Sequence, residues 1–284
     1  MIKMMAAICR KPGMTHAEYV AYVQHVHGAI SNENQVALRR YVQNHVLDAA
    51  FGSRAETTHT MTVARDSVTE LWWDSPQDMQ VTFTHDHVRT KVGPDGANFG
   101  DVSRTLSVVA VEAEQPVPNP GPAVGAKVLH YLRMADGLAL TEFFERWARA
   151  HERALFASPV AAAALRRCVH NRQLSEFNPM LAYFGAKDVP VYEGVASLWF
   201  DDVSSVGAFR AYERALMEIN ARADAKFYDE AQSFFVYATE VLIYERRDCA
   251  ANESANESPS AQGRVCSRSH QGLHLGKIAC PYTA

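Results

Sequence analysis

The sequence predicts an α+β protein built from two similar units, each ordered strand, helix, strand, strand, helix, strand. Two observations support this prediction. Short apolar segments alternate with amphipathic ones as far as about residue 247. Four sequence blocks of the first half also recur in the second half, in the same order and about 125 residues later. Such a spacing is too long for a solenoid repeat and fits two small domains.

The clearest recurrence joins the segment from Met14 to His27 with the segment from Leu138 to His151, since both end in histidine after 13 positions. The other matched blocks pair residues 38–44 with 165–171, 71–74 with 198–201, and 98–101 with 226–229. We therefore expect an internal duplication in which His27 and His151 occupy equivalent positions.

In the first unit, capping signals define where each helix begins. Thr15 and Glu18 form a capping box, and Ser75 precedes Pro76 at the second helix. The predicted elements are a strand over 2–10, a helix over 15–30, strands over 38–47 and 67–73, a helix over 75–91 and a strand over 104–112. Residues 48–65 are expected to form a loop, and the Gly-Pro-Asp-Gly segment 93–96 a turn.

The second unit repeats this order after a segment rich in proline and glycine. We expect strands over 126–134, 165–173, 194–200 and 234–245, with helices over 139–157 and 203–222. The tail has no apolar periodicity and is predicted to be disordered. The predicted domains are residues 1–115 (the active copy), a linker over 116–125, residues 126–247 (a degenerate copy) and the tail over 248–284.

Composition excludes several classes of protein. The net charge of −4 gives no electrostatic basis for binding nucleic acid or an anionic membrane. No apolar run approaches the roughly 20 residues of a membrane span. The five cysteines (9, 168, 249, 266 and 280) lack paired spacing, which favours reduced thiols in a cytoplasmic protein.

The first motif resembles the EthD family, a branch of the dimeric α/β-barrel superfamily. The resemblance rests on a strand followed by Arg10-Lys-Pro-Gly-Met14 and a helix ending in His27-Gly28. It implies two ferredoxin-like βαββαβ units that form an intrachain, pseudo-dimeric α/β-barrel. We therefore expect a monomer or a weak homodimer. The superfamily includes cyclases, isomerases, dehydratases, monooxygenases and accessory proteins, so the resemblance supports the fold more than a reaction.

Histidine is concentrated in the first copy, which suggests one active pocket and one scaffolding copy. On the second helix, Met79, Phe83 and His87 recur at helical spacing and Asp86 borders them. The segment around His87 also resembles the His-Val segment of small barrel-type polyketide cyclases, whose histidine is a general base. We therefore expect His87 to be a catalytic base, because imidazole exchanges protons near neutral pH.

His27 is a second catalytic candidate, although a structural role at the end of its helix is an open alternative. A base that removes a proton next to a carbonyl also needs a donor for the developing enolate. Candidate donors are Tyr22, Tyr41, His45 and His27 itself. The expected substrate-binding residues are Asp86, Phe83, Trp72 and Val23.

These residues predict a cofactor-independent lyase, cyclase or isomerase that acts on a small hydrophobic, aromatic or polyketide-like molecule. The alternative is a non-catalytic ligand-binding accessory protein of a degradation pathway, which would not need imidazole. We expect no cofactor and no metal. His85 and His87 diverge by about 200° on a regular helix, and the spacing of Cys266, His270, His274 and Cys280 fits no standard zinc site.

Overall fold

The computed structural model describes residues 1–48, 65–122, 125–181 and 190–246. The predicted loop over 48–65 therefore lies almost entirely outside the described residues, as does the predicted tail. Residues Met1–Arg247 form one compact unit, so the two predicted copies are parts of one body.

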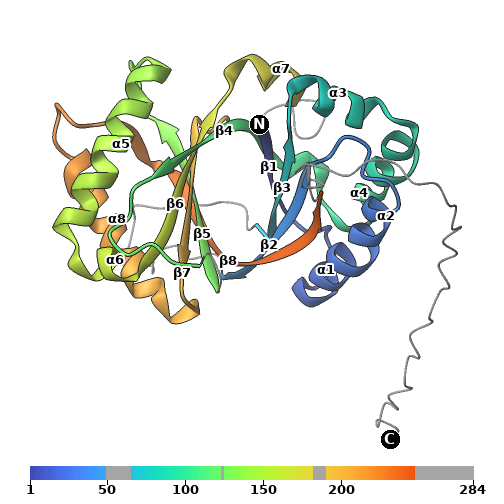
Figure 1. Ribbon diagram of the computed structural model, residues 1–284, viewed down its shortest axis with the longest axis horizontal. Coiled ribbons are helices and arrows are strands. Elements are labelled where there is room, and N and C mark those ends of the chain that lie inside the picture. Colours follow the sequence, from blue (N-terminus) through green and yellow to red (C-terminus); the bar gives the residue numbers. More distant parts are fainter. Residues whose placement is uncertain (49–64, 123–124, 182–189, 247–284) are drawn as a thin grey trace, which may run out of the picture. The chain divides into compact units, whose positions relative to one another are not determined.

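The first half contains four strands and two helical segments, and the helices lie together on one side of the barrel (Figure 1). Its strands are β1 (Ile2–Ile8), β2 (Arg40–Asp48), β3 (Ser67–Trp73) and β4 (Leu106–Gln115). The first helical segment comprises α1 (His16–Tyr22), a π-helical turn η1 (Val23–His27) and α2 (Gly28–Asn32). The second comprises α3 (Pro76–Thr84), a π-helical turn η2 (Val88–Val92), α4 (Gly93–Phe99) and a 3-10 turn (Val102–Arg104).

The second half repeats this order with longer, more regular helices. Its strands are β5 (Ala126–Met134), β6 (Leu165–Gln173), β7 (Gly194–Phe200) and β8 (Tyr228–Glu245). Its main helices are α5 (Leu140–Ala157), α6 (Pro159–Ala164), α7 (Asn178–Leu181) and α8 (Val206–Asn220), with 3-10 turns over Ser175–Phe177 and Val203–Ser205. None of the helices in the described part of the chain is long and apolar enough to cross a membrane.

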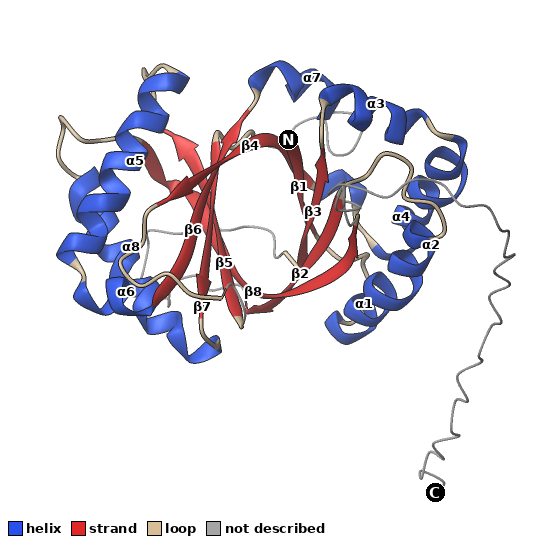
Figure 2. Ribbon diagram, in the orientation of Figure 1, coloured by secondary structure: helices blue, strands red, loops and turns tan. Residues whose placement is uncertain are grey.

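The eight strands close into one antiparallel barrel in the order β1-β3-β2-β8-β5-β7-β6-β4. Each half contributes four neighbouring strands, and the halves join where β2 pairs with β8 and β4 pairs with β6. Figure 2 shows the helices of the first half on one side of the barrel and α5, α6 and α8 of the second half on the other. The predicted α+β barrel is confirmed.

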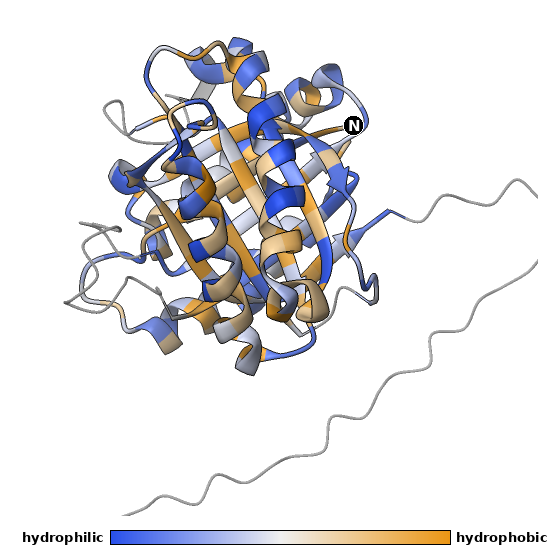
Figure 3. Ribbon diagram, turned by 90° about the vertical axis from the view of Figure 1, so that its left-hand side faces the viewer, coloured by the Kyte–Doolittle hydropathy of each residue, from blue (hydrophilic) through white to orange (hydrophobic). Residues whose placement is uncertain are grey.

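The helices cover the outer face of the barrel with their apolar sides. Figure 3 shows hydrophobic residues on the strands behind the second-half helices and hydrophilic residues on the helix faces turned to the viewer. Inside the barrel, Lys3 and Lys127 both contact Glu70, at 2.6 and 2.5 Å between nitrogen and oxygen. All three side chains are at most 1% exposed, so the halves share a buried ion cluster.

One predicted element of the first half is wrong in a way that matters for the site. The second helix does not continue to residue 91, because α3 ends at Thr84 and His85 has extended backbone angles. Residues 93–96 are not a turn but begin α4, where Pro94 lies in the first turn and Asp95 follows it. Pro94 lies directly after the π-helical turn Val88–Val92, so the helical path is irregular at this point.

Candidate active site

A cavity of about 420 Å³ lies between the sheet of the first half and its helices. We call it the inner cavity. Its floor comes from β1, β3 and β4, and its walls come from η1 and the α3–α4 segment. The lining is mostly apolar, as is typical of sites for hydrophobic small molecules. It includes Met4, Ile8, Leu71, Val23, Phe83 and Phe99 as apolar residues, and His27, Thr69, Arg89, Thr105 and Ser107 as polar ones.

His27 is the only histidine among the residues that line the inner cavity. Its Nδ1 lies 2.8 Å from Asp95 Oδ2, and the two side chains are 14% and 7% exposed. Since a carboxylate accepts hydrogen bonds, Nδ1 carries the proton and Nε2 keeps its lone pair. The same logic orients the histidine of a catalytic triad, in which a buried carboxylate fixes the tautomer that acts as a base.

Two local features of the chain place these side chains. The π-helical turn η1 inserts an irregularity at Val23–His27, and such turns often occur at functional sites. Helix α4 then presents Asp95 in its first turn, toward His27. Phe99 at the other end of α4 packs against the imidazole, with ring centroids 4.7 Å apart. The ring is therefore held by a hydrogen bond and an aromatic neighbour.

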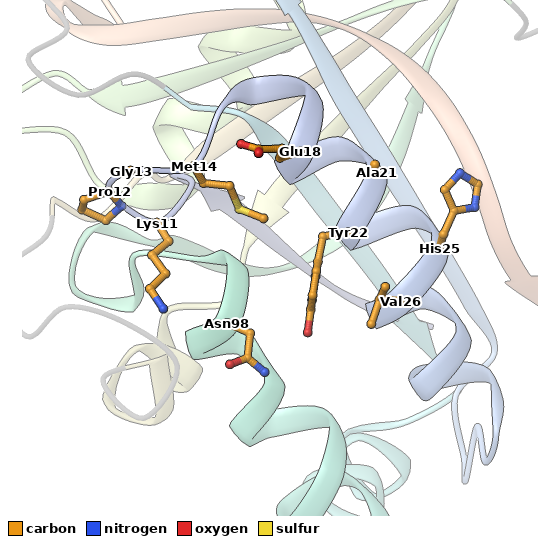
Figure 4. A pocket seen from close by; sticks show the side chains of 10 residues that line it. All are labelled: Lys11, Pro12, Gly13, Met14, Glu18, Ala21, Tyr22, His25, Val26 and Asn98. Atoms are coloured by element: carbon orange, nitrogen blue, oxygen red, sulfur yellow. The ribbon is translucent and has the colours of Figure 1, made fainter. Parts of the chain in front are cut away.

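On its outer side, Asp95 is held by two further donors. Tyr22 Oη donates to Asp95 Oδ1 at 2.7 Å, and Asn98 Nδ2 donates to the same oxygen at 2.9 Å. Figure 4 shows Tyr22 and Asn98 converging across an open surface groove, whereas His25 points away from them. Asp95 thus connects Tyr22 and Asn98, which line the surface groove, to His27, which lines the inner cavity.

The electrostatics favour a neutral imidazole beside an ionised carboxylate. Burial lowers the pKa of His27, and the hydrogen bond to Asp95 offsets this only in part. Burial by itself would raise the pKa of Asp95, but the hydrogen bonds from Asn98, Tyr22 and His27 outweigh it, so that pKa lies below its usual value. At neutral pH, His27 is therefore an unprotonated base.

The cavity also offers donors for a developing negative charge. Ser107 Oγ is buried and has no hydrogen-bond partner among the described residues. A buried hydroxyl without a partner is costly, so a bound polar group would satisfy it. Arg89 also lines the cavity and brings a positive charge, although its side chain is 61% exposed. The arrangement can remove a proton on one side and stabilise an oxyanion on another.

His87, the predicted base, does not line the inner cavity. Its Nε2 lies 3.0 Å from the carbonyl oxygen of Ile30, to which it donates a hydrogen bond. The helical spacing that linked His87 to Met79 and Phe83 fails because the helix breaks at His85. The side chain of Asp86 is 92% exposed. Neither residue has the position that the sequence predicted for it.

Of the other predicted site residues, Trp72 and His45 do not line the inner cavity. Trp72 lies inside the barrel, where its indole nitrogen donates a hydrogen bond to Glu112 at 3.1 Å. The Nε2 atom of His45 forms a hydrogen bond with Gln43 at 2.9 Å. Val23 and Phe83 do line it. Tyr41 lines a smaller adjoining cavity of about 90 Å³, which His27 and Phe83 also line. Tyr22 acts on His27 indirectly, through Asp95.

Sequence reasoning missed Asp95, Asn98 and Ser107. Asp95 was hidden in a segment that is typical of a turn, although proline near a helix start offered the other interpretation. Asn98 does belong to one of the recurring blocks, which was the available signal. Neither His27 nor Asp95 belongs to a group of three or more metal-ligating side chains; among the described residues, one such group is found, in the second half.

The fold and this geometry define an α/β-barrel protein with a histidine–aspartate pair beside an apolar cavity. The model of the EthD domain matches residues 11–103, which include every member of that pair and its supports Tyr22 and Asn98. The chain therefore carries an EthD domain in its first half.

One of the reported solved structures shows the same fold at low sequence identity. A structure described as an anthrone oxidase-like protein is 10% identical, covers 88% of this chain and 96% of its own, and has a TM-score of 0.51. Two others have TM-scores below one half: a proposed monooxygenase from Lactobacillus acidophilus at 7% identity and a chlorite dismutase from Candidatus Nitrospira defluvii at 7%. They cover 85% and 84% of this chain, and 94% and 90% of their own. No curated protein matches the sequence.

Proposed function

We propose that the first half is a general-base catalyst that removes a proton next to the carbonyl of a hydrophobic, aromatic substrate. The observation that carries this proposal is the hydrogen bond of His27 to Asp95, which leaves the second ring nitrogen available at the wall of an apolar cavity. A base held in one tautomer by a buried carboxylate is what proton abstraction requires.

The chemistry consists of one proton transfer. His27 Nε2 takes the proton from the carbon, and the electron pair of the broken C–H bond moves to the carbonyl oxygen. Ser107 and Arg89 would stabilise the resulting enolate, because both lie on the lining of the same cavity. If the proton returns to another carbon, the reaction is an isomerisation. If the enolate instead expels a neighbouring hydroxyl group, the reaction is a dehydration. Neither outcome requires an electron acceptor.

The size and lining of the cavity support the substrate class. At about 420 Å³ it is within the range of small-molecule sites, and its aromatic and aliphatic walls suit a flat ring system. The likeness to an anthrone oxidase-like protein shows the fold alone, but it suggests anthrone as a probe. Anthrone is a tricyclic ketone whose ring methylene lies opposite the carbonyl and is acidified through the conjugated rings. Loss of its proton moves the electron pair onto the carbonyl oxygen, as loss of a proton next to a carbonyl does.

The test is exchange of the methylene protons of anthrone with deuterated solvent, followed by proton NMR without oxygen. We expect His27→Ala to slow the protein-catalysed exchange by at least ~100-fold, the contribution of a general base. Asp95→Asn should slow it by up to about 10⁴-fold, since an asparagine no longer holds the tautomer that keeps a lone pair on Nε2. Anthrone affinity, measured by calorimetry, should change little in either variant.

His87→Ala is the control, because this histidine lies on the helical segment that carries Asp95 but does not line the inner cavity. Unchanged exchange in His27→Ala would refute the proposed base. Binding of anthrone by the native chain without exchange above the rate in buffer would instead favour the ligand-binding accessory function. No binding at all would refute the proposed substrate class.

A further inference from the structure

Three metal-ligating side chains converge in the second half, away from the inner cavity. His151 comes from α5, and Cys168 and His170 come from one face of β6 because they are two residues apart. All three are fully buried, and their ligand atoms lie within 4.8 Å of one another. Nitrogen and sulfur ligands in such a cluster suit thiophilic transition-metal ions.

His170 supplies an independent sign of a ligand. Neither of its ring nitrogens has a hydrogen-bond partner among the described residues, although the side chain is 0% exposed. Its ring stacks on the indole of Trp147 with centroids 3.6 Å apart, which keeps water from one face. A buried polar group without a hydrogen-bond partner destabilises the folded state. Coordination of a metal by one nitrogen would remove part of that destabilisation.

His151 has the hydrogen bond that orients a ligating histidine. Its Nε2 donates to the carbonyl oxygen of Pro116 at 3.2 Å, which leaves the lone pair on Nδ1. That nitrogen lies 3.8 Å from Cys168 Sγ and accepts a hydrogen bond from Tyr212 Oη at 3.0 Å, which metal binding would replace. A backbone carbonyl on the second ring nitrogen is the usual support of a metal-bound histidine.

We propose that His151, Cys168 and His170 bind one soft transition-metal ion, with Cu⁺ as the ion that the site fits best. With metal–ligand bonds of about 2.0–2.3 Å, trigonal ligands lie about 3.6–3.8 Å apart. The nitrogen–sulfur distance of 3.8 Å already matches this spacing. The third ligand needs to move by about 1 Å at most.

Charge balance selects the ion. A thiolate with Cu⁺ and two neutral histidines has no net charge, whereas the same ligands with Zn²⁺ leave one positive charge in a fully buried site. Burial lowers the pKa of His151 to about 4 and that of His170 well below its usual value, so both are neutral. Burial also raises the pKa of Cys168, so the metal must displace the thiol proton and release it to solvent.

The site would be structural, since it is closed and offers no exposed coordination position. It would tie α5 to β6. The first half has no equivalent, because Tyr41 and Gln43 occupy the places that match Cys168 and His170 in the recurring block. The proposal is therefore independent of the chemistry proposed for His27.

The test uses the full chain with Cys249, Cys266 and Cys280 replaced by serine, so that thiols of the tail cannot contribute. This parent protein is refolded without oxygen in the presence of Cu⁺ or Zn²⁺, desalted, and its metal content is measured by mass spectrometry. Refolding gives the ion access to a site that is closed in the folded state. We expect one Cu⁺ per chain, a proton released on binding, and a higher melting temperature.

Two variants each remove one metal ligand, and a third variant is the control. Cys168→Ala and His170→Gln should each weaken Cu⁺ binding more than ~100-fold, beyond the cost of losing a supporting hydrogen bond. The glutamine is the residue at the matching position of the first half. Cys9→Ser removes the other buried thiol of the described chain and should keep the metal.

If the refolded parent protein retains no metal, the proposal is overturned, and no variant is needed to show this. Equal metal content in the parent and in folded Cys168→Ala would also overturn it. Retention of one Zn²⁺ but no Cu⁺ would overturn the assignment to a monovalent ion.

Discussion

The two halves of the barrel place a histidine at equivalent positions and surround it differently. His27 lines the inner cavity, and its Nε2 atom has no hydrogen bond to the described residues. His151 is 0% exposed, and both its ring nitrogens have neighbours, Tyr212 Oη and the carbonyl oxygen of Pro116. The same helix position thus holds a cavity-lining histidine in one half and a fully buried histidine in the other.

The difference comes from the side chains around the imidazole. Val23 in the first half corresponds to Trp147 in the second, and Tyr19 corresponds to Phe143. Trp147 and Phe143 are fully buried and stack with ring centroids 5.7 Å apart. Their packing is so tight that a Cβ added at Gly194 would lie 2.6 Å from the Trp147 ring. In the second half, aromatic rings fill the space that corresponds to the inner cavity of the first half.

The largest effect on stability is expected when a buried aromatic side chain is removed from the second half. Trp147→Ala should lower the free energy of unfolding by about 3–5 kcal/mol, the usual cost of removing a buried tryptophan. Val23→Ala is the matched variant and should cost less than half as much, since that side chain borders a cavity. Chemical denaturation measures both. Equal losses would contradict the view that only the second half is a packed core.

The buried histidine of the second half should make stability depend on pH. His151 has a pKa of about 4 in the folded chain and near 6.5 when unfolded, so the unfolded state binds more protons between these values. Stability is therefore lost as pH falls through this window, by about 3 kcal/mol for this residue. His170 adds a loss in the same direction.

Denaturation of the metal-free chain near pH 7 and near pH 4, compared with His151→Gln, measures the contribution of His151. The carboxylates titrate in both proteins, so their effects cancel in the comparison. An equal pH dependence in the two proteins would show that His151 is not held neutral by burial.

A smaller effect, on ligand affinity, is expected when Val23 is replaced by tryptophan, the residue at the matching position of the second half. Val23→Trp should fill part of the inner cavity and weaken the binding of anthrone more than about tenfold, since one excluded contact is worth about 1–3 kcal/mol. Stability should change little, because the cavity accepts the ring. Calorimetric titration measures the affinity. Unchanged affinity would place the ligand elsewhere, for example in the groove beside Tyr22.

The smallest effect is expected at His87. Its hydrogen bond to Ile30 O lies in a partly exposed setting, and such a bond contributes about 0.5–1.5 kcal/mol to stability. His87→Ala should therefore lower the free energy of unfolding by about 1 kcal/mol and leave proton exchange on anthrone unchanged. A large loss of exchange would restore His87 as the base.

Much of the strand framework could be predicted from the chain. The strands over 67–73, 126–134, 165–173 and 194–200 have the predicted bounds. Apolar residues locate three of them, whereas the polar strand over 165–173 is located by its match to the block over 38–44. The Thr15–Glu18 capping box is present as well. The helical segment around His87 could not be predicted, since a break at one residue changes the direction of every side chain after it.

By itself, the sequence determined that two similar α+β units exist, where most strands lie, and that His27 and His151 are equivalent. These properties follow from local periodicity and from repetition along the chain. Only the tertiary structure decided which histidine meets a carboxylate and which meets an aromatic core. Asp95 is 68 residues from His27 along the chain, and a contact of that separation depends on how the helices pack on the barrel.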